Sequence, residues 1–211
     1  MLLIVLFLIQ DIKYFFQFVK GKINMGRPRS SSARESIFNY TQKLLCEKNY
    51  NSITIEEISK NSGVSKSTIY RWWDNKDILT MDIFMSEMET KTEYPDTGNT
   101  FNDFLFQLMN ISKIFNSPLG KATLEIVVNS DSDEKAKEMY RNDFFLPIRT
   151  KALLILERGI SRKEINPNID KEAILDLIYS PLYFRLLINP GTLNKEYFLH
   201  ELEIIQMAIE F

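Results

Sequence analysis

The chain has 211 residues, of which 45% are apolar, and its formal net charge is −2. This length accommodates one domain or two small ones, and the apolar content is ample for a core. A single cysteine, Cys46, excludes a framework of internal disulfides and fits a reducing cytoplasm. We expect Cys46 to be a small residue of the core rather than a redox switch.

The small net charge conceals two segments of opposite sign. Residues 26–80 contain nine Lys and Arg against six Asp and Glu, whereas residues 81–211 contain fourteen against twenty-one. A basic front and an acidic rear suit a module that faces DNA, joined to a module that stays away from it.

The first 24 residues fit nothing that follows them. Their apolar run, Leu2–Ile9, is shorter than the roughly 18 residues that a membrane-spanning helix needs. No basic region precedes the run, as a signal peptide would require. We expect residues 1–24 to be sequence upstream of a true start at Met25, or a disordered extension. A membrane-tethered regulator is the alternative.

Two arginines at the start of the basic segment, Arg27 and Arg29, form a short cationic arm. Arms of this kind enter the minor groove beside helical DNA-binding domains. Ser31 or Ser32 then caps a helix that runs to about Lys48. Its inward positions recur at helical spacing and are expected to cover a DNA-reading pair of helices: Ile37, Tyr40, Thr41, Leu44 and Leu45.

A second helix and a tight turn come next. Thr54 and Glu57 form the S/T-x-x-E pattern of a capping box, so a helix begins at Thr54, its cap residue. Ile55 and Ile58 lie on its buried face. Gly63 supplies the positive φ that a short turn between two packed helices needs.

The third helix of this segment has an exposed face of hydrogen-bonding and cationic side chains, without Asp or Glu. A helix start favours phosphate through its free N–H groups and its dipole, and side chains of these types read base edges and bind backbone oxygens. We therefore expect DNA contacts from Ser65, Lys66, Ser67, Thr68, Tyr70 and Arg71, supported by Thr54 and Trp72. The alternative is an ordinary helical hairpin on the surface.

The segment Gly26–Leu79 resembles the N-terminal domain of the tetracycline-repressor (TetR) family of bacterial transcription regulators. The resemblance rests on GRPR at Gly26–Arg29, a helix over Ser32–Lys48, TIEEIS at Thr54–Ser59 and GVSKSTIYRWWDNKDIL at Gly63–Leu79. By this resemblance Trp73 takes the place of the core aromatic, and Trp72 sits near the phosphates. Ser67 stands where family members commonly have Gly, which changes what approaches the groove.

Asn75 caps a further helix, Lys76–Lys91, whose first turn presents Lys76 to the DNA backbone. In the family that the chain resembles, this helix links the DNA-binding domain to the rest of the protein, so its tilt sets the spacing of two recognition helices. We assign residues 25–80 to the DNA-binding domain and residues 81–211 to a helical rear domain. A loop over residues 94–99 follows the linking helix.

Every element after this loop is expected to be helical. Thr100 and Asp103 cap the first helix, and Leu119–Asn129 forms a shorter one. The inward residues of the shorter helix are Leu124, Val127 and Val128.

A long helix is expected from the acidic start at residues 131–134 to Arg158. Pro147 should kink this helix, and Gly159 stands just past its end.

The last two helices are apolar on two sides. One follows Asp170 and reaches about Ile188, and the other begins at Asn194 or Lys195. A helix with two apolar sides needs two partners, which suggests the chain's own core and the same helices of a second copy. We expect a homodimer interface that includes Leu175, Leu182, Leu186, Phe198, Leu202, Ile205 and Ile209. A second stripe consists of Leu177, Pro181, Phe184 and Ile188. The alternative is the core of a monomeric bundle.

The TetR resemblance also implies a small hydrophobic effector, whose binding retilts the recognition helices and releases DNA. Candidate pocket residues in the rear domain are Phe104, Leu108, Phe115, Tyr140, Phe144 and Tyr179. The plain alternative is that these side chains are ordinary core.

Catalysis finds no support in the sequence. With one His and one Cys, the chain offers no His/Cys metal cluster, and it contains no P-loop, G-x-G-x-x-G or G-x-S-x-G motif. We expect no catalytic residue, no metal and no cofactor.

These features predict an all-α protein with an N-terminal three-helix helix-turn-helix domain and a C-terminal helical bundle for ligand binding and dimerisation. The expected function is regulation of transcription in the cytoplasm, by a repressor that a small hydrophobic ligand releases from a palindromic double-stranded DNA operator; no membrane partner is expected. One alternative is a constitutive DNA-binding adaptor whose rear domain binds a protein. Another is an enzyme with an accessory helix-turn-helix.

Overall fold

The computed structural model describes residues 31–88 and 95–209. Backbone contacts divide the chain into two units, residues 1–35 and residues 36–211. Of the first unit only residues 31–35 are described, as the start of helix α2 (Ser31–Glu47). The predictions for residues 1–24, Arg27 and Arg29 lie outside the described residues.

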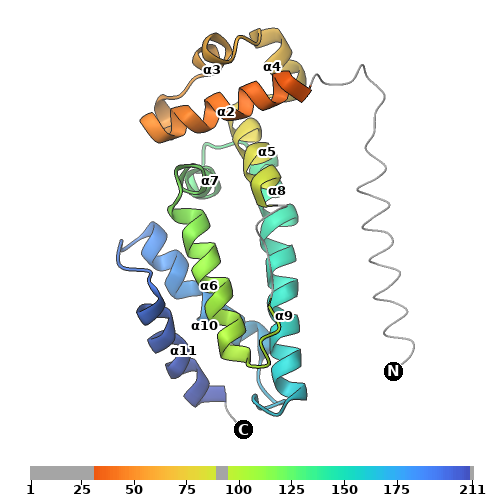
Figure 1. The fold of residues 1–211 in the computed structure, drawn as a ribbon, viewed down its shortest axis with the longest axis vertical. Helices are drawn as coiled ribbons and strands as arrows, with labels where there is room; N and C mark the ends of the chain where they lie inside the picture. Colours follow the sequence, from red (N-terminus) through yellow and green to blue (C-terminus); the bar gives the residue numbers. More distant parts are fainter. Residues whose placement is uncertain (1–30, 89–94, 210–211) are drawn as a thin grey trace, which may run out of the picture. The chain divides into compact units, whose positions relative to one another are not determined.

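The described residues form helices and connecting segments, without a β-strand among them (Figure 1). The second unit begins within α2 and continues through a 3-10 turn, η1 (Tyr50–Ser52), and the helices α3 (Ile55–Ser62), α4 (Lys66–Trp72) and α5 (Lys76–Met88). It then contains α6 (Thr100–Asn116), α7 (Pro118–Val128), α8 (Glu134–Tyr140), a wide π turn η2 (Arg141–Phe145), α9 (Leu146–Ser161), α10 (Lys171–Leu187) and α11 (Lys195–Ile209). The all-α prediction is confirmed.

Most of the expected inward stripe of α2 is buried. Ile37, Thr41, Leu44 and Leu45 are inside the molecule, because they recur on one side of the helix. Tyr40 and Cys46 are exposed, so the prediction that they belong to the core is wrong. Tyr40 lies at the edge of the buried stripe, next to the polar side of the helix. Cys46 likewise follows the last buried position, Leu45, on the water-facing side.

The local signals around α3 are confirmed. The Thr54 side chain accepts a hydrogen bond from the Glu57 N–H at 3.2 Å, as a helix cap should. Gly63 ends the helix with φ of 69°, a left-handed conformation that favours glycine. The Ser36 hydroxyl donates to the carbonyl of Ser62 at 2.9 Å and connects α2 to this turn.

Helix α5 is apolar on almost every side and packs against α7, α8 and η2. Its expected cap is confirmed, because the Asn75 side chain accepts a hydrogen bond from the Ile78 N–H at 3.0 Å. The buried residues of α5 are Ile78, Leu79, Thr80, Met81, Ile83, Phe84 and Met88. This helix therefore joins the core of the first helices to the core of the rear helices.

The rear helices form a bundle in which α6 packs against α7, α9, α10 and α11 (Figure 1). On α7 Leu124 is buried, as expected, whereas Val128 is exposed. Ile126 is buried on this helix as well. The expectation for Val128, the last residue of α7, is therefore wrong.

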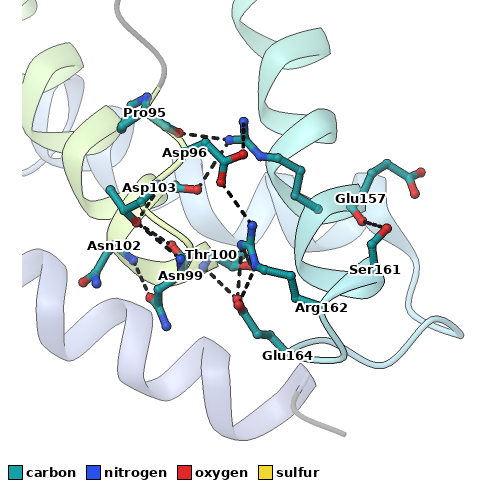
Figure 2. Close-up of polar contacts among 12 residues, drawn as sticks. Pro95, Asp96, Asn99, Thr100, Asn102, Asp103, Glu157, Ser161, Arg162 and Glu164 are labelled. Carbon is teal, nitrogen blue, oxygen red and sulfur yellow. Dashed lines mark hydrogen bonds and ion pairs between the residues drawn. The ribbon is translucent and has the colours of Figure 1, made fainter.

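A polar network joins the start of α6 to the end of α9 (Figure 2). The cap of α6 is Asn99, which accepts from the Asn102 N–H at 2.9 Å, so the expected cap at Thr100 is wrong by one residue. Thr100 is buried, and its N–H donates instead to Glu164 at 2.8 Å. Asp103 is fully buried and accepts from Arg158 at 3.4 Å. These partners supply the acceptors and charges that burial of polar groups requires.

The helix expected to end at Arg158 differs from the prediction at both ends. Its first part is the short helix α8, followed by the wide turn η2, which ends two residues before Pro147. The kink expected at the proline is therefore replaced by a π turn just before it. Gly159 does not end the helix, which continues to Ser161. A Cβ at Gly159 would lie 2.3 Å from the Thr100 hydroxyl, so glycine serves close packing of α9 on α6.

Candidate nucleic-acid interface

Helix α4 starts from a side-chain cap. The Ser65 hydroxyl accepts from the Thr68 N–H at 3.3 Å and lies 3.0 Å from the hydroxyls of both Ser67 and Thr68. Ile69 is fully buried and fixes one side of the helix against the core. The opposite side of α4 is therefore held in a defined position toward solvent.

The solvent side of α4 carries the residues predicted to contact DNA. Lys66, Ser67, Tyr70 and Arg71 are exposed, and α4 itself contains no acidic residue. We call these four residues the recognition surface. The remaining members of the predicted set, Ser65 and Thr68, form the cap, and Thr54 caps α3.

One carboxylate does reach the recognition surface, from the neighbouring helix. The Lys66 ammonium lies 2.9 Å from a carboxylate oxygen of Glu56 on α3. Their hydrogen bond lowers the pKa of Glu56 and raises the pKa of Lys66. Both side chains are largely exposed, and such surface pairs stabilise a fold little. A phosphate oxygen would therefore replace Glu56 as the partner of Lys66 at small cost.

The two adjacent tryptophans have different environments. Trp73 is buried, and its indole N–H donates to Asp82 at 2.9 Å, so the structure places it as the core aromatic. Trp72 is only partly buried and meets Trp73 edge to face, with ring centroids 5.4 Å apart. The Arg71 guanidinium carbon lies 5.9 Å from the centroid of the Trp72 ring, within the range of a cation–π contact.

Lys76 does not present its charge to DNA, and that prediction is withdrawn. Its ammonium donates to the carbonyls of Tyr50 and Ile53 at 2.8 and 2.9 Å and lies 4.0 Å from the centroid of the Tyr50 ring. Burial lowers the pKa of Lys76. The side chain folds back onto the segment before α3, where both carbonyls accept hydrogen bonds from its ammonium. Its role is to hold that segment against α5.

A polar cluster at the start of α5 connects the DNA-reading helices with α8. The Tyr50 hydroxyl donates to Asp77, and the Asp133 N–H donates to the other oxygen of Asp77 at 2.9 Å. The Asn75 side chain donates to Asp133 at 2.7 Å, and Asp133 also caps α8. Burial, followed by the hydrogen bond to Asp77, raises the pKa of Tyr50.

Sequence reasoning missed this cluster, because Asp133 is more than fifty residues from Asn75 and Asp77 and each member also fits an ordinary local role. A second connection of the same kind joins Asn51 of η1 to Glu125 of α7, where the amide donates to the carboxylate. Polar side chains therefore connect α7 to η1, and the cap of α8 to the start of α5.

The six residues predicted to line a pocket are buried core instead. Their aromatic members pack together, with Phe144 and Phe115 centroids 5.6 Å apart, and the Tyr140 and Tyr183 hydroxyls 3.2 Å apart. Beside Phe144, Tyr179 and Tyr183 there is a cavity of only about 10 Å³, room for about one water molecule. The residues that fill this region are Phe104, Leu108, Phe115, Tyr140, Phe144 and Tyr179. Close packing of large rings leaves them little free volume.

The predicted dimer residues are also buried, within the chain's own bundle. Leu175, Leu182, Phe198, Leu202, Ile205 and Ile209 are inaccessible to a second copy, and Leu186 is partly buried. The prediction took the side of each helix that faces the chain's own core, because a helix that is apolar on two sides does not reveal which side is the inner one.

The opposite sides of these two helices are exposed and apolar. Phe184 of α10 is 52% exposed, and Ile204 and Met207 of α11 are 70% and 82% exposed. We call the set Leu177, Phe184, Ile188, Ile204 and Met207 the apolar surface. Large exposed apolar side chains on adjacent helices are typical of a surface that another protein covers.

Within residues 31–88 and 95–209 no helix has the length and apolar character needed to cross a membrane. No group of three or more His, Cys, Asp and Glu side chains is placed to hold a metal ion in the same ranges.

Comparison with known proteins gives matches over both segments of the chain. The model described as bacterial regulatory proteins of the tetR family matches residues 37–80, and the model described as the tetracyclin repressor-like C-terminal domain matches residues 94–203. YdeS of Bacillus subtilis (strain 168), an HTH-type transcriptional regulator, is 37% identical over 172 residues, which are 82% of this chain and 87% of YdeS.

Solved structures agree with this fold. SCO0332, a TetR family transcription regulator, has a TM-score of 0.65 at 24% identity, with 84% of this chain and 98% of SCO0332 covered. MexZ, a repressor responsible for antibiotic resistance in Pseudomonas aeruginosa, has a TM-score of 0.61 at 15% identity, with 83% and 96% covered. At these identities the two likenesses speak for the fold alone.

Proposed function

Since the chain belongs to the tetracycline-repressor (TetR) family of DNA-binding transcription regulators, which are not enzymes, we propose that it is a cytoplasmic repressor. It acts as a homodimer on a palindromic operator and leaves the DNA when a small ligand binds the rear domain. The domain assignment, residues 25–80 for DNA and residues 81–211 for ligand and dimer, belongs to this proposal.

The recognition surface is the observation that carries the DNA-binding part of the proposal. Lys66 and Arg71 provide positive charge on an exposed helix side, and Ser67 and Tyr70 provide hydroxyl groups between them. Such side chains suit phosphate oxygens and base edges in a major groove. The caps of α3 and α4 and the buried Ile69 keep this surface in one orientation.

The apolar surface supports the homodimer. A short recognition helix reads only a few base pairs, whereas a two-fold dimer reads two half-sites about 34–36 Å apart. Covering Phe184, Ile204 and Met207 with the same residues of a second copy would give the self-complementary contact that two-fold symmetry requires. A repressor role and release by a ligand are typical of the TetR family.

The test is fluorescence-anisotropy binding of the full chain to DNA segments from around its own gene, at several salt concentrations. The double variant Lys66→Ala/Arg71→Ala and scrambled DNA are the controls. We expect tight binding to one segment, steep weakening by salt, and loss of binding in the variant. Equal, weak binding of both proteins to every DNA would contradict the proposal.

A second candidate is a constitutive DNA-binding adaptor whose rear domain contacts a protein. The packed aromatic core favours it, because that region leaves room for about one water molecule. A thermal-shift screen with small apolar compounds separates the two candidates, since a ligand of the folded state raises the melting temperature. A stabilising compound that also releases DNA would exclude the adaptor.

A further inference from the structure

A groove of about 450 Å³ lies on the rear domain, outside the aromatic core. Its walls come from the end of α6, one side of α7, the end of α10 and the segment that leads to α11. The lining includes Lys121, Glu125, Val128, Arg185, Leu186 and Leu187. The volume falls within the range of sites that bind small molecules.

The groove combines apolar walls with two cations. Val128, Leu186 and Leu187 supply the apolar walls. Neither Lys121 nor Arg185 forms an ion pair or hydrogen bond with another residue of the described ranges. Glu125, the one carboxylate in the lining, accepts the hydrogen bond from the Asn51 amide. The lining thus has a net charge of about +1 at neutral pH, with two donors that lack an acceptor.

The Arg185 guanidinium is held in place without using its N–H groups. Its carbon lies 4.2 Å from the centroid of the Tyr197 ring, a cation–π contact. Gly191 leaves the space that the guanidinium occupies, because a Cβ there would lie 2.0 Å from the Arg185 Nη1 atom. A planar donor group fixed by ring stacking is preorganised for a carboxylate.

Glu201 interacts electrostatically with Arg185 but does not form a hydrogen bond with it. Both carboxylate oxygens of Glu201 are buried without a hydrogen-bond partner among the described residues. Burial raises the pKa of Glu201 to about 7, and the charge of Arg185 offsets only part of this rise. Glu201 is therefore only partly ionised near pH 7, and it compensates only part of the charge of Arg185.

We propose that this groove is the effector site, and that its effector is a small amphipathic carboxylic acid. The apolar body lies against Val128, Leu186 and Leu187, and the carboxylate pairs with Arg185 and Lys121. A single negative charge fits better than a polyphosphate, because Glu125 shares the lining. This inference rests on the proposed function and replaces the aromatic core as the place where a ligand acts.

Helix α7 provides the route from this groove to the DNA-reading helices. Lys121, Leu124 and Glu125 line the groove from α7, and Glu125 also bonds Asn51 in the segment before α3. Helix α5 packs against α7 as well. An occupant that pairs with Lys121 and displaces α7 therefore alters both contacts at once and changes the position of the recognition surface.

The test uses straight-chain carboxylates from hexanoate to dodecanoate with the full chain, below their micelle concentrations. Binding is measured by calorimetry, and release of operator DNA by anisotropy. We expect at least one acid to bind with micromolar to millimolar affinity and to release DNA. The matched alcohol and amine should bind at least tenfold more weakly, because neither places a negative charge at Arg185.

Two variants test the site itself. Arg185→Gln should weaken binding of the acid at least tenfold, and Val128→Trp should abolish it by filling the groove, while Lys113→Gln, an exposed lysine elsewhere on α6, should leave it unchanged. Circular dichroism and operator binding without acid show that each variant is folded.

The inference and the proposed function fail in different ways. No binding of any acid, equal binding of acid and alcohol, or equal binding by wild type and Arg185→Gln would overturn the groove as a carboxylate site while operator binding stands. Absence of specific DNA binding by the wild-type protein would overturn the proposed function, whatever the acids do.

Discussion

Two exposed surfaces of the second unit have opposite chemistry. The recognition surface on α4 offers Lys66, Tyr70 and Arg71, whose charges and hydroxyl groups are well hydrated. The apolar surface on α10 and α11 offers Ile204 and Met207, which water hydrates poorly. The first is stable in water with or without a partner, whereas the second is stabilised when another apolar surface covers it.

This difference predicts opposite responses to solution conditions. Salt screens contacts between α4 and phosphates, so DNA binding should weaken steeply as salt rises. Apolar contact is little affected by moderate salt and depends on protein concentration instead. The two surfaces are therefore separable by experiment, even though the proposed function needs both.

The largest effect should come from placing charge on the apolar surface. Ile204→Glu/Met207→Glu would bury like charges in a dimer interface, so we expect a folded monomer. Losing the second half-site contact should weaken operator binding by about 100-fold or more. Light scattering and anisotropy measure the two effects, and Glu203→Gln, an exposed neighbour on α11, is the control. A double variant that stays dimeric would contradict our assignment of this surface.

The next effect separates two lysines near the recognition surface. Lys76→Met removes the ammonium that donates to the carbonyls of Tyr50 and Ile53, so it should lower the free energy of unfolding by about 2 kcal/mol. The melting temperature should fall by about 4–8 °C in thermal denaturation. Operator affinity per folded molecule should change little. Lost affinity at unchanged stability would restore Lys76 to the DNA contacts.

Lys66→Ala should give the reverse pattern. Operator affinity should fall by about tenfold, with a shallower salt dependence if the contact is to phosphate. The melting temperature should stay nearly constant, because the pair with Glu56 is exposed. Anisotropy at several salt concentrations and thermal denaturation measure both, with Lys113→Ala as the control. Unchanged DNA affinity would remove Lys66 from the recognition surface.

The smallest effect concerns the acid on α11. Burial raises the pKa of Glu201 from its ordinary value of 4.5 to about 7 in the folded state. The folded protein therefore binds more protons than the unfolded chain between these values, and this group's contribution to stability falls as pH rises from about 4.5 to 7. Glu201→Gln should remove that loss.

Glu201 is partly exposed, so solvent screening reduces the effect of its charge. Glu201→Gln should therefore be more stable than wild type by about 1 kcal/mol at pH 8. At pH 5 the difference should be much smaller. Thermal denaturation at both pH values measures it, and Glu203→Gln should show no such dependence. A gain of equal size at both pH values would mean that the carboxylate is not the cause.

The DNA-reading helices were predictable residue by residue because their signals are local. The cap at Thr54, the left-handed Gly63 and the cap at Ser65 each depend on neighbours within four residues. The sequence therefore contains all the information that these features need. Lys76 was mispredicted because its partners, the carbonyls of Tyr50 and Ile53, come from more than twenty residues away.

The rear domain shows where local information ends. Glycine near a helix end normally indicates a stop, but Gly159 is required by the approach of Thr100, some sixty residues earlier. The orientation of α10 and α11 likewise depends on which apolar side meets α6. The groove around Arg185 has no sequence signal, because its walls come from separate helices.

The wide turn η2 has a geometric consequence for the helix that contains it. Buried residues recur at every fourth position through Ala136, Tyr140, Phe144, Ile148 and Ala152. On a regular α-helix this spacing drifts by about 40° at each step, so the stripe would wind away from the core. The π turn has more residues per turn and reverses part of that drift.

The extra residue in η2 is therefore an insertion that keeps the inward stripe in phase. Deleting one residue from 141–145 would restore a regular helix but rotate the remainder by about 100° relative to Tyr140. Ile148 and Ala152 would then turn away from the core, and residues now in water would turn toward it. The length of this segment is under the same constraint as the identity of its buried side chains.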